Sequence, residues 1–108
     1  MLFMRDKEKY RFVGYLENHI NGDKIKFRYR YTQNETMEND FYDNKQHIIM
    51  TCTIEIEGNP NLMVRDKIVL QNGNIYSIFT LSPLYQESNV LVSELVKQKP
   101  MAWVCELR

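Results

Sequence analysis

The turn signals constrain this chain more than any other feature. Only four glycines and three prolines occur in 108 residues, and most stand where an extended chain has to reverse. Asn21-Gly22 separates two runs rich in β-forming residues, 10–20 and 23–31, and Asn-Gly is the preferred central pair of a tight hairpin turn. Asn72-Gly73-Asn74 separates two further runs, 67–71 and 75–81. The spacing therefore predicts two β-hairpins.

The predicted first hairpin has two different faces. Placing Ile20 opposite Asp23 sets Leu16 across from Phe27 and makes one face apolar and aromatic. The other face is basic, because four cationic residues recur at two-residue spacing on the second strand. They are Lys24, Lys26, Arg28 and Arg30. Such a stripe faces water, nucleic-acid phosphates or an acidic partner surface, and water is the commonest answer.

The stretch after the first hairpin is polar and acidic. Residues 33–46 contain no glycine, no proline and few apolar groups, so the pattern predicts a long loop. Loops of that length in compact domains are usually either functional or disordered. Its acidic residues are Glu35, Glu38, Asp40 and Asp43. From His47 to Glu57, strict alternation then predicts a half-buried strand with Cys52 facing inward.

The second hairpin is apolar on both faces, which indicates cover by the core on one side and by a helix or a neighbouring subunit on the other. Val69, Tyr76 and Ile78 are the predicted interface residues of this hairpin. Residues 86–100 are predicted to form a short helix or an extended arm, with Leu91 and Leu95 on its apolar stripe. Alternation from Met101 onward predicts a closing strand.

About six short strands, two hairpins and at most one short helix indicate a mainly β fold. We expect a single domain over residues 1–108, a small antiparallel β-barrel with one long loop. At 13.0 kDa, such a chain can bury a core without disulfides or a structural metal.

Chemical motifs are sparse. Cys52 and Cys105 are far apart and belong to no Cys-x-x-Cys pair, so both are expected to be buried thiols, and His19 and His47 are expected to be polar surface residues. The chain has no nucleophile elbow, P-loop or dinucleotide fingerprint. We therefore expect no enzyme activity, catalytic residue, metal, cofactor or small-molecule substrate. No apolar run approaches the length of a membrane span, and no membrane association is expected.

One resemblance emerges in the second half of the chain. The segment from Asp66 to Phe79, followed by the segment from Met101 to Leu107, resembles head–tail connector proteins of tailed bacteriophages, of the stopper or head-completion type. The shared pattern is a basic residue before Ile68, then Gly73, Tyr76 and Ile78, and a final strand ending in Cys-Glu. The match covers roughly residues 47–107, and Lys67 stands where the family usually has arginine.

The resemblance implies a structural protein of the virion neck, assembled in the cytoplasm of a bacterial host. Such a protein forms a homo-oligomeric ring between a portal or adaptor protein and a tail-completion protein, and it retains packaged double-stranded DNA. Family members close the channel with a long loop, a role that the position and length of residues 33–46 would fit. The acidic groups of residues 33–46 would line a DNA conduit with repulsive charge. The resemblance also makes Val69, Tyr76, Ile78, Leu91 and Leu95 candidate contacts within the ring or with the portal.

A second function of a different class stays open. A single-stranded nucleic-acid-binding barrel would use the basic face, with Tyr15 stacking on bases. The formal net charge of zero is no argument against an electrostatic role, because residues 1–32 hold eight basic and four acidic groups while residues 33–57 hold one and six. The chain is therefore expected to be polarised, and copies of it could pair basic and acidic surfaces around a ring.

Overall fold

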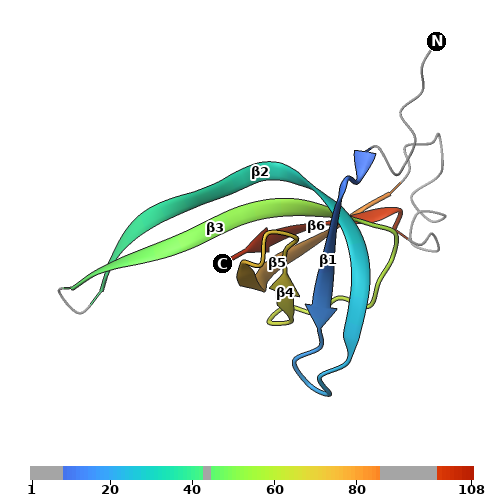
Figure 1. Ribbon diagram of the computed structural model, residues 1–108, viewed down its shortest axis with the longest axis horizontal. Coiled ribbons are helices and arrows are strands. Elements are labelled where there is room, and N and C mark those ends of the chain that lie inside the picture. The colour runs from blue at the N-terminus through green and yellow to red at the C-terminus, as the bar shows by residue number, and fades with distance from the viewer. Residues whose placement is uncertain (1–8, 43–44, 86–99) are drawn as a thin grey trace, which may run out of the picture.

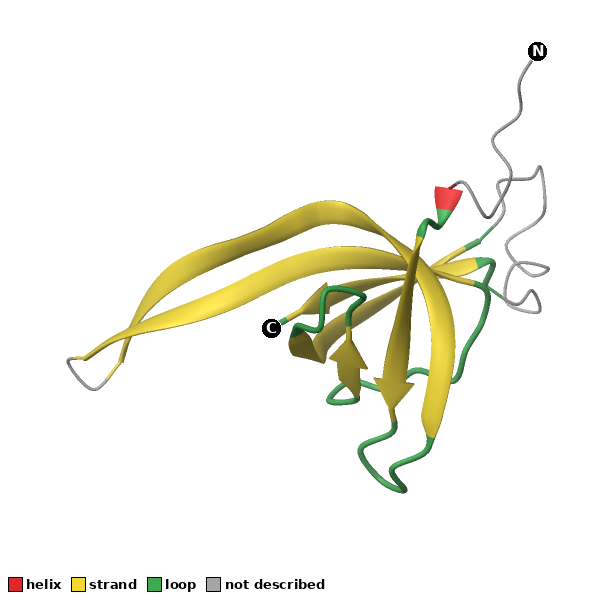
Figure 2. Ribbon diagram, viewed as in Figure 1, coloured by secondary structure: helices red, strands yellow, loops and turns green. Residues whose placement is uncertain are grey.

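A computed structural model describes residues 9–42, 45–85 and 100–108 of the chain. In chain order, the six strands of these residues are β1 (Phe12–Glu17), β2 (Lys24–Tyr42), β3 (Lys45–Glu57), β4 (Lys67–Val69), β5 (Ile75–Leu84) and β6 (Ala102–Leu107). They form a closed antiparallel barrel in the order β1-β2-β3-β6-β5-β4 (Figure 1). The prediction of a mainly β, antiparallel barrel is confirmed (Figure 2).

The predicted long loop at 33–46 is wrong. β2 and β3 run on as paired strands to the Tyr42↔Lys45 pair, and together they extend past the rest of the described chain (Figure 1). We call residues 36–42 and 45–51 the ribbon. Its polar composition reflects a two-stranded element with solvent on both faces, and the absence of glycine and proline leaves its backbone free to pair.

The first hairpin is confirmed, but its turn is longer than predicted. The strands pair as Leu16↔Ile25 and Gly14↔Phe27, a shift of two residues that leaves every side chain on its predicted face. The connection is held by the Asn18 side chain, which accepts hydrogen bonds from the amides of Ile20 and Asn21 at 2.8 and 3.2 Å. A side-chain cap inside the connection therefore displaced the expected two-residue turn.

The second hairpin is confirmed with a different assignment of faces. Ile68 pairs with Tyr76 and Val69 with Ile75, so Tyr76 and Ile78 are core residues at 4% and 2% exposure. Their prediction as interface residues is therefore wrong, because the five residues between the strands put Tyr76, and not Ile75, on the face of Ile68. Val69 is half-buried on the outer face. Leu91 and Leu95, and the predicted helix or arm apart from Pro100, lie outside the described residues.

The core fills the barrel from all six strands. Its fully buried members include Leu16, Ile54, Ile56 and Leu107, and an aromatic cluster of Phe12, Phe27, Tyr29 and Tyr31 joins them, with ring centroids 5.2–5.7 Å apart. Each adjacent pair in such a cluster adds stability beyond its buried area.

Gly14 makes room for this cluster. A Cβ atom at Gly14 would lie 2.8 Å from the Val69 carbonyl oxygen and 2.9 Å from the Phe27 ring. The strand therefore needs glycine here because the ring and a neighbouring backbone approach closely.

Candidate functional site

The base of the ribbon is shaped by two irregularities in β2. Between the pairs Tyr31↔Ile54 and Thr36↔Thr51, β2 advances five residues while β3 advances three. Bulges of this kind bend a strand and redirect side chains, and they are common at the rims of barrels. Here the extra residues carry the ribbon away from the barrel and turn Glu35 back toward the barrel's end.

Glu35 accepts four hydrogen bonds at this rim. Tyr31 donates to its Oε1 atom at 2.8 Å and Tyr76 to its Oε2 atom at 2.5 Å. The side-chain amides of Asn72 and Asn74 donate to the same two oxygens at 2.6 and 2.5 Å. We call these five residues the Glu35 cluster, and it ties the base of the ribbon to the β4–β5 turn.

The electrostatics of the Glu35 cluster favour a charged carboxylate. Burial alone would raise the pKa of Glu35, but the hydrogen bonds from Tyr76, Asn74, Tyr31 and Asn72 together hold the pKa below its ordinary value. Burial and the bond to Glu35 raise the pKa of Tyr31 and of Tyr76. The carboxylate is thus an anchor whose oxygens are occupied, rather than a free base.

The predicted channel residues are not brought together as one acidic lining. Glu35 points into the rim, whereas Glu38 is exposed on the ribbon. Asp40 lies in β2 at the register position opposite His47, and Asp43 lies outside the described residues. Glu35, the acidic residue nearest the barrel, therefore has hydrogen-bond partners that the acidic pattern alone did not reveal.

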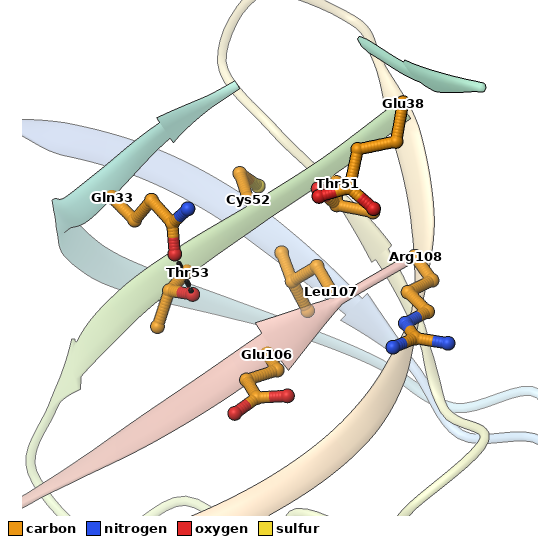
Figure 3. Close-up of a pocket in the computed structure, with 8 residues that line it drawn as sticks. All are labelled: Gln33, Glu38, Thr51, Cys52, Thr53, Glu106, Leu107 and Arg108. Atoms are coloured by element: carbon orange, nitrogen blue, oxygen red, sulfur yellow. Dashed lines mark hydrogen bonds between the residues drawn. The ribbon is translucent and has the colours of Figure 1, made fainter. Parts of the chain in front are cut away.

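A small polar pocket lies beside the ribbon base (Figure 3). It has a volume of about 190 Å³, and the Thr53 hydroxyl donates to Gln33 Oε1 at 3.4 Å across its wall. Its lining residues are Gln33, Glu38, Thr51, Cys52, Thr53, Glu106, Leu107 and Arg108. Small-molecule sites are typically apolar with a few converging polar groups, and this lining is mostly polar.

Both cysteines are buried thiols, as predicted. Burial raises the pKa of Cys52 to about 11 and that of Cys105 to about 12. At neutral pH both groups are therefore protonated, which is the form of cysteine that does not attack electrophiles.

The predicted basic face is present on the outside of β2, but its two arginines are already paired. Arg30 donates to Glu55 Oε1 at 2.9 Å, and the Tyr10 hydroxyl donates to Glu55 Oε2 at 2.6 Å. Arg28 lies 3.5 Å from Glu57 and donates to the Tyr10 carbonyl oxygen at 3.0 Å. Lys24 and Lys26 are exposed, so the stripe offers two lysines to a partner rather than four cations.

Glu55 lies on the outer face of β3, yet it is only 3% exposed. Burial would raise its pKa, but the hydrogen bonds from Arg30 and Tyr10, together with the charges of Arg30 and Lys9, hold the pKa below its ordinary value. Lys9 and Tyr10, just before β1, therefore lie over the outer face of β3 and cover this carboxylate.

His19 has a structural partner that its sequence position did not suggest. Its Nδ1 atom lies 2.5 Å from Asp66 Oδ1, which also accepts the His19 amide at 3.0 Å. Asp66 is fully buried, and its other oxygen accepts the Met63 amide at 3.1 Å. Asp66 thus connects the β1–β2 turn to the segment before β4. Its pairing with His19, 47 residues away in sequence, is visible only in the three-dimensional structure.

Comparisons with protein-family models, with curated proteins and with solved structures find no match to this chain. Within 9–42, 45–85 and 100–108, no group of three or more histidine, cysteine or acidic residues is arranged to hold a metal ion. The same ranges contain no helix with the length and apolar character needed to cross a bilayer. The features that bear on function are therefore the ribbon, its anchored base and the surfaces beside it.

Proposed function

We propose that the protein is a structural head–tail connector, of the stopper or head-completion type, from a tailed phage or prophage. It forms a homo-oligomeric ring at the portal vertex, joins the head to the tail and retains packaged DNA. The observation that carries this proposal is the ribbon, a long element anchored at its base and exposed beyond it. Small antiparallel barrels are also the fold that the sequence resemblance implies.

The geometry of the ribbon suits a protein that works by contact. Its base is fixed by the four hydrogen bonds to Glu35, whereas its outer part exposes Met37 and Ile48 at 72% and 67%. Exposed apolar side chains gathered on one element are typical of an association surface. The ribbon replaces the predicted loop as the element that would reach a neighbour or the DNA channel.

The partners follow from this role. The ring would contact a portal or adaptor protein on one side and a tail-completion protein on the other, with double-stranded DNA passing through. The ribbon segment 36–51 holds three acidic residues and one lysine, a balance that would repel the phosphate backbone and favour sliding over adhesion. Localisation would be the virion neck after assembly in the bacterial cytoplasm.

The experiment is reconstitution with the portal–adaptor complex encoded in the same genome. Light scattering and electron microscopy are expected to show a ring of this protein bound to that complex. A chain that stays monomeric and unbound under those conditions would contradict the proposal. Portal and capsid genes upstream and tail genes downstream would support it independently.

Single-stranded nucleic-acid binding is the second candidate, supported by the exposure of Lys24 and Lys26 beside Tyr15 on the outer face. It predicts binding to oligonucleotides that weakens steeply with salt and is lost in the double variant Lys24→Glu/Lys26→Glu. No binding at low salt would end this candidate. The pairing of Arg28 and Arg30 with Glu57 and Glu55 makes it the weaker of the two.

A further inference from the structure

The outer face of the β1–β2 hairpin carries two hollows, with volumes of about 310 and 480 Å³. Residues of β1, β2 and β4 line the first hollow: Tyr15, Glu17, Lys24 and Val69. Residues of β1, β2, β3 and the loop after β3 line the second, among them Val13, Lys26, Arg28, Glu57 and Pro60. Each hollow has room for an apolar side chain of a partner.

Both hollows combine apolar walls with exposed positive charge. Tyr15 is 49% exposed, and Val13 and Val69 are half-buried. Three exposed lysines stand beside them in the register: Lys24, Lys26 and Lys67. These lysines form no ion pair with the described part of the chain. We call Val13, Tyr15 and Val69 with the three lysines the lysine face.

The lysine face keeps a positive charge after its acidic neighbours are counted. Glu17 stands between Lys24 and Lys67 in the register, and Glu57 lies 3.5 Å from Arg28. Arg28 and Glu57 balance each other, whereas the three lysines exceed the single carboxylate of Glu17. Because complementary charge steers association and sets its orientation, this surface fits an anionic partner.

The carboxylate of Glu17 narrows the class of anion. Glu17 is half-buried and accepts no hydrogen bond from the described part of the chain. A peptide carries an N–H donor on the main chain of each residue except proline, and such a donor can bind this carboxylate. Phosphodiester groups carry acceptors only, so a nucleic-acid backbone would meet Glu17 as a repulsive charge. Glu17 therefore favours a peptide over a nucleic acid.

The aromatic content of the two hollows favours the same partner. Proteins that bind single strands stack successive bases on aromatic side chains. Among the residues that line the two hollows, Tyr15 alone presents an exposed ring, because Phe27 in the second hollow is only 6% exposed. The valine walls suit aliphatic side chains better than a series of bases.

The spacing of the hollows suits an extended chain. Val13 lines one hollow and Tyr15 the other, and two residues of a strand span about 7 Å. Alternate side chains of an extended peptide lie on one side with the same spacing. Such a peptide can therefore place one aliphatic side chain in each hollow, with acidic residues before and after them near the lysines.

We infer that the lysine face binds an acidic, extended segment of another protein. Two aliphatic side chains of that segment fill the hollows, its carboxylates lie at the three lysines, and a main-chain N–H donates to Glu17. Apolar anchors in pockets supply most of the affinity in such contacts, and charge sets the orientation. The inference goes beyond the proposed connector role and does not rest on the ribbon or on a ring.

Fluorescence anisotropy of a labelled peptide with the full-length chain tests this site. The peptide carries two leucines at alternate positions with aspartates on both sides, and a control peptide has serine in place of both leucines. The leucine peptide is expected to bind at least tenfold more tightly, because burial of leucine in the hollows is favourable, and to lose affinity as salt screens the lysines. Equal affinities, or no binding of either peptide, would overturn the inference.

Competition with a single-stranded oligonucleotide of the same charge separates the two classes of anionic partner. The oligonucleotide is expected to leave the leucine peptide bound at equal concentration. Displacement of the peptide under that condition would overturn the inference and favour the nucleic-acid candidate.

Charge reversal locates the site. Lys26→Glu is expected to weaken binding of the leucine peptide about tenfold, whereas Lys45→Glu, at an exposed lysine in the last pair of the ribbon, should leave the affinity unchanged. Equal effects of the two variants would overturn the inference. The peptide is measured without the portal–adaptor complex, so its failure to bind leaves the connector proposal standing, and a failure to assemble on that complex leaves the peptide site standing.

Discussion

At the scale of single residues, the Glu35 carboxylate holds the base of the ribbon through four hydrogen bonds. For Leu16 and Phe27, the alternation in the first hairpin was enough to place both inward, and both are buried, because a two-residue shift in register preserves the face. The role of Glu35 could not be predicted, because its partners Asn72 and Asn74 are 37 and 39 residues away in sequence. The acidic pattern indicated a solvated carboxylate, and two bulges redirect it into the rim.

Replacing Glu35 with glutamine should destabilise the protein. The variant keeps the shape of the side chain but loses the charge and puts an NH₂ group where one carboxylate oxygen accepts from two of the four donors, so the free energy of unfolding should fall by about 2 kcal/mol, the size of a hydrogen bond to a charged group. Urea unfolding measures the loss. Glu38→Gln is the matched control on an exposed site and should change stability by less than about 0.5 kcal/mol. Equal losses in the two variants would show that the Glu35 cluster does not anchor the ribbon.

The two depressed carboxyl pKa values predict acid sensitivity. Glu35 and Glu55 have folded-state pKa values below their ordinary value of 4.5, so the stability that they contribute is present above pH 4.5 and is lost as the pH falls through the folded values. As the pH falls below 4.5, the free energy of unfolding should decline less steeply in Glu55→Gln than in the wild type. Urea unfolding at a series of pH values measures this slope. A Glu38→Gln control should keep the wild-type slope, and an unchanged slope in Glu55→Gln would contradict the assignment.

Gly14 should tolerate no side chain without cost. In Gly14→Ala the new methyl group meets the Val69 carbonyl oxygen and the Phe27 ring, and overpacking of this kind usually costs about 1–3 kcal/mol. Thermal and urea unfolding measure the effect. Ser77→Ala, at an exposed position of β5, is the control. A wild-type melting temperature in Gly14→Ala would show that the ring and strand can move aside.

At the scale of elements, five of the six strands begin and end near the predicted boundaries, because turn residues and alternation mark elements that border a core. The ribbon was missed because neither of its faces borders the core. The available signals were Thr32, Thr36, Phe41 and Tyr42, which favour strands, in a stretch without glycine or proline. The polar composition of residues 33–46 favoured a loop over these strand signals. In the structure, that composition reflects solvent on both faces of the ribbon rather than an irregular backbone.

Hydrogen exchange should distinguish a ribbon from a loop. In the register Met37↔Met50 and Glu38↔Ile49, half of the backbone amides of residues 36–39 and 48–51 point toward the partner strand. Those amides should exchange more slowly than the other half, which point away from the partner strand. Uniformly fast exchange through residues 36–51 would show a loop and would remove the basis of the connector proposal.

At the scale of the whole molecule, the chain combines a closed barrel with a projecting ribbon. The barrel has no free strand edges, whereas each strand of the ribbon has one edge without a paired strand among the described residues. Exposed strand edges and apolar faces are association-prone unless they are covered.

Shortening the ribbon should separate folding from assembly. Replacing residues 37–50 with a short Asn-Gly turn leaves the β3–β6 pairs from Cys52 to Glu57 intact, so the barrel should fold with a cooperative unfolding transition. Analytical ultracentrifugation should then show loss of self-association. A shortened chain that assembles like the wild type would show that the ribbon is not the assembly element.

The proposal that this protein is a ring-forming connector is tested most directly by electron microscopy of the full-length chain with its portal–adaptor complex. We expect a closed ring of this protein docked on the complex. A complex that carries no added density, with the chain remaining monomeric in solution, would contradict it.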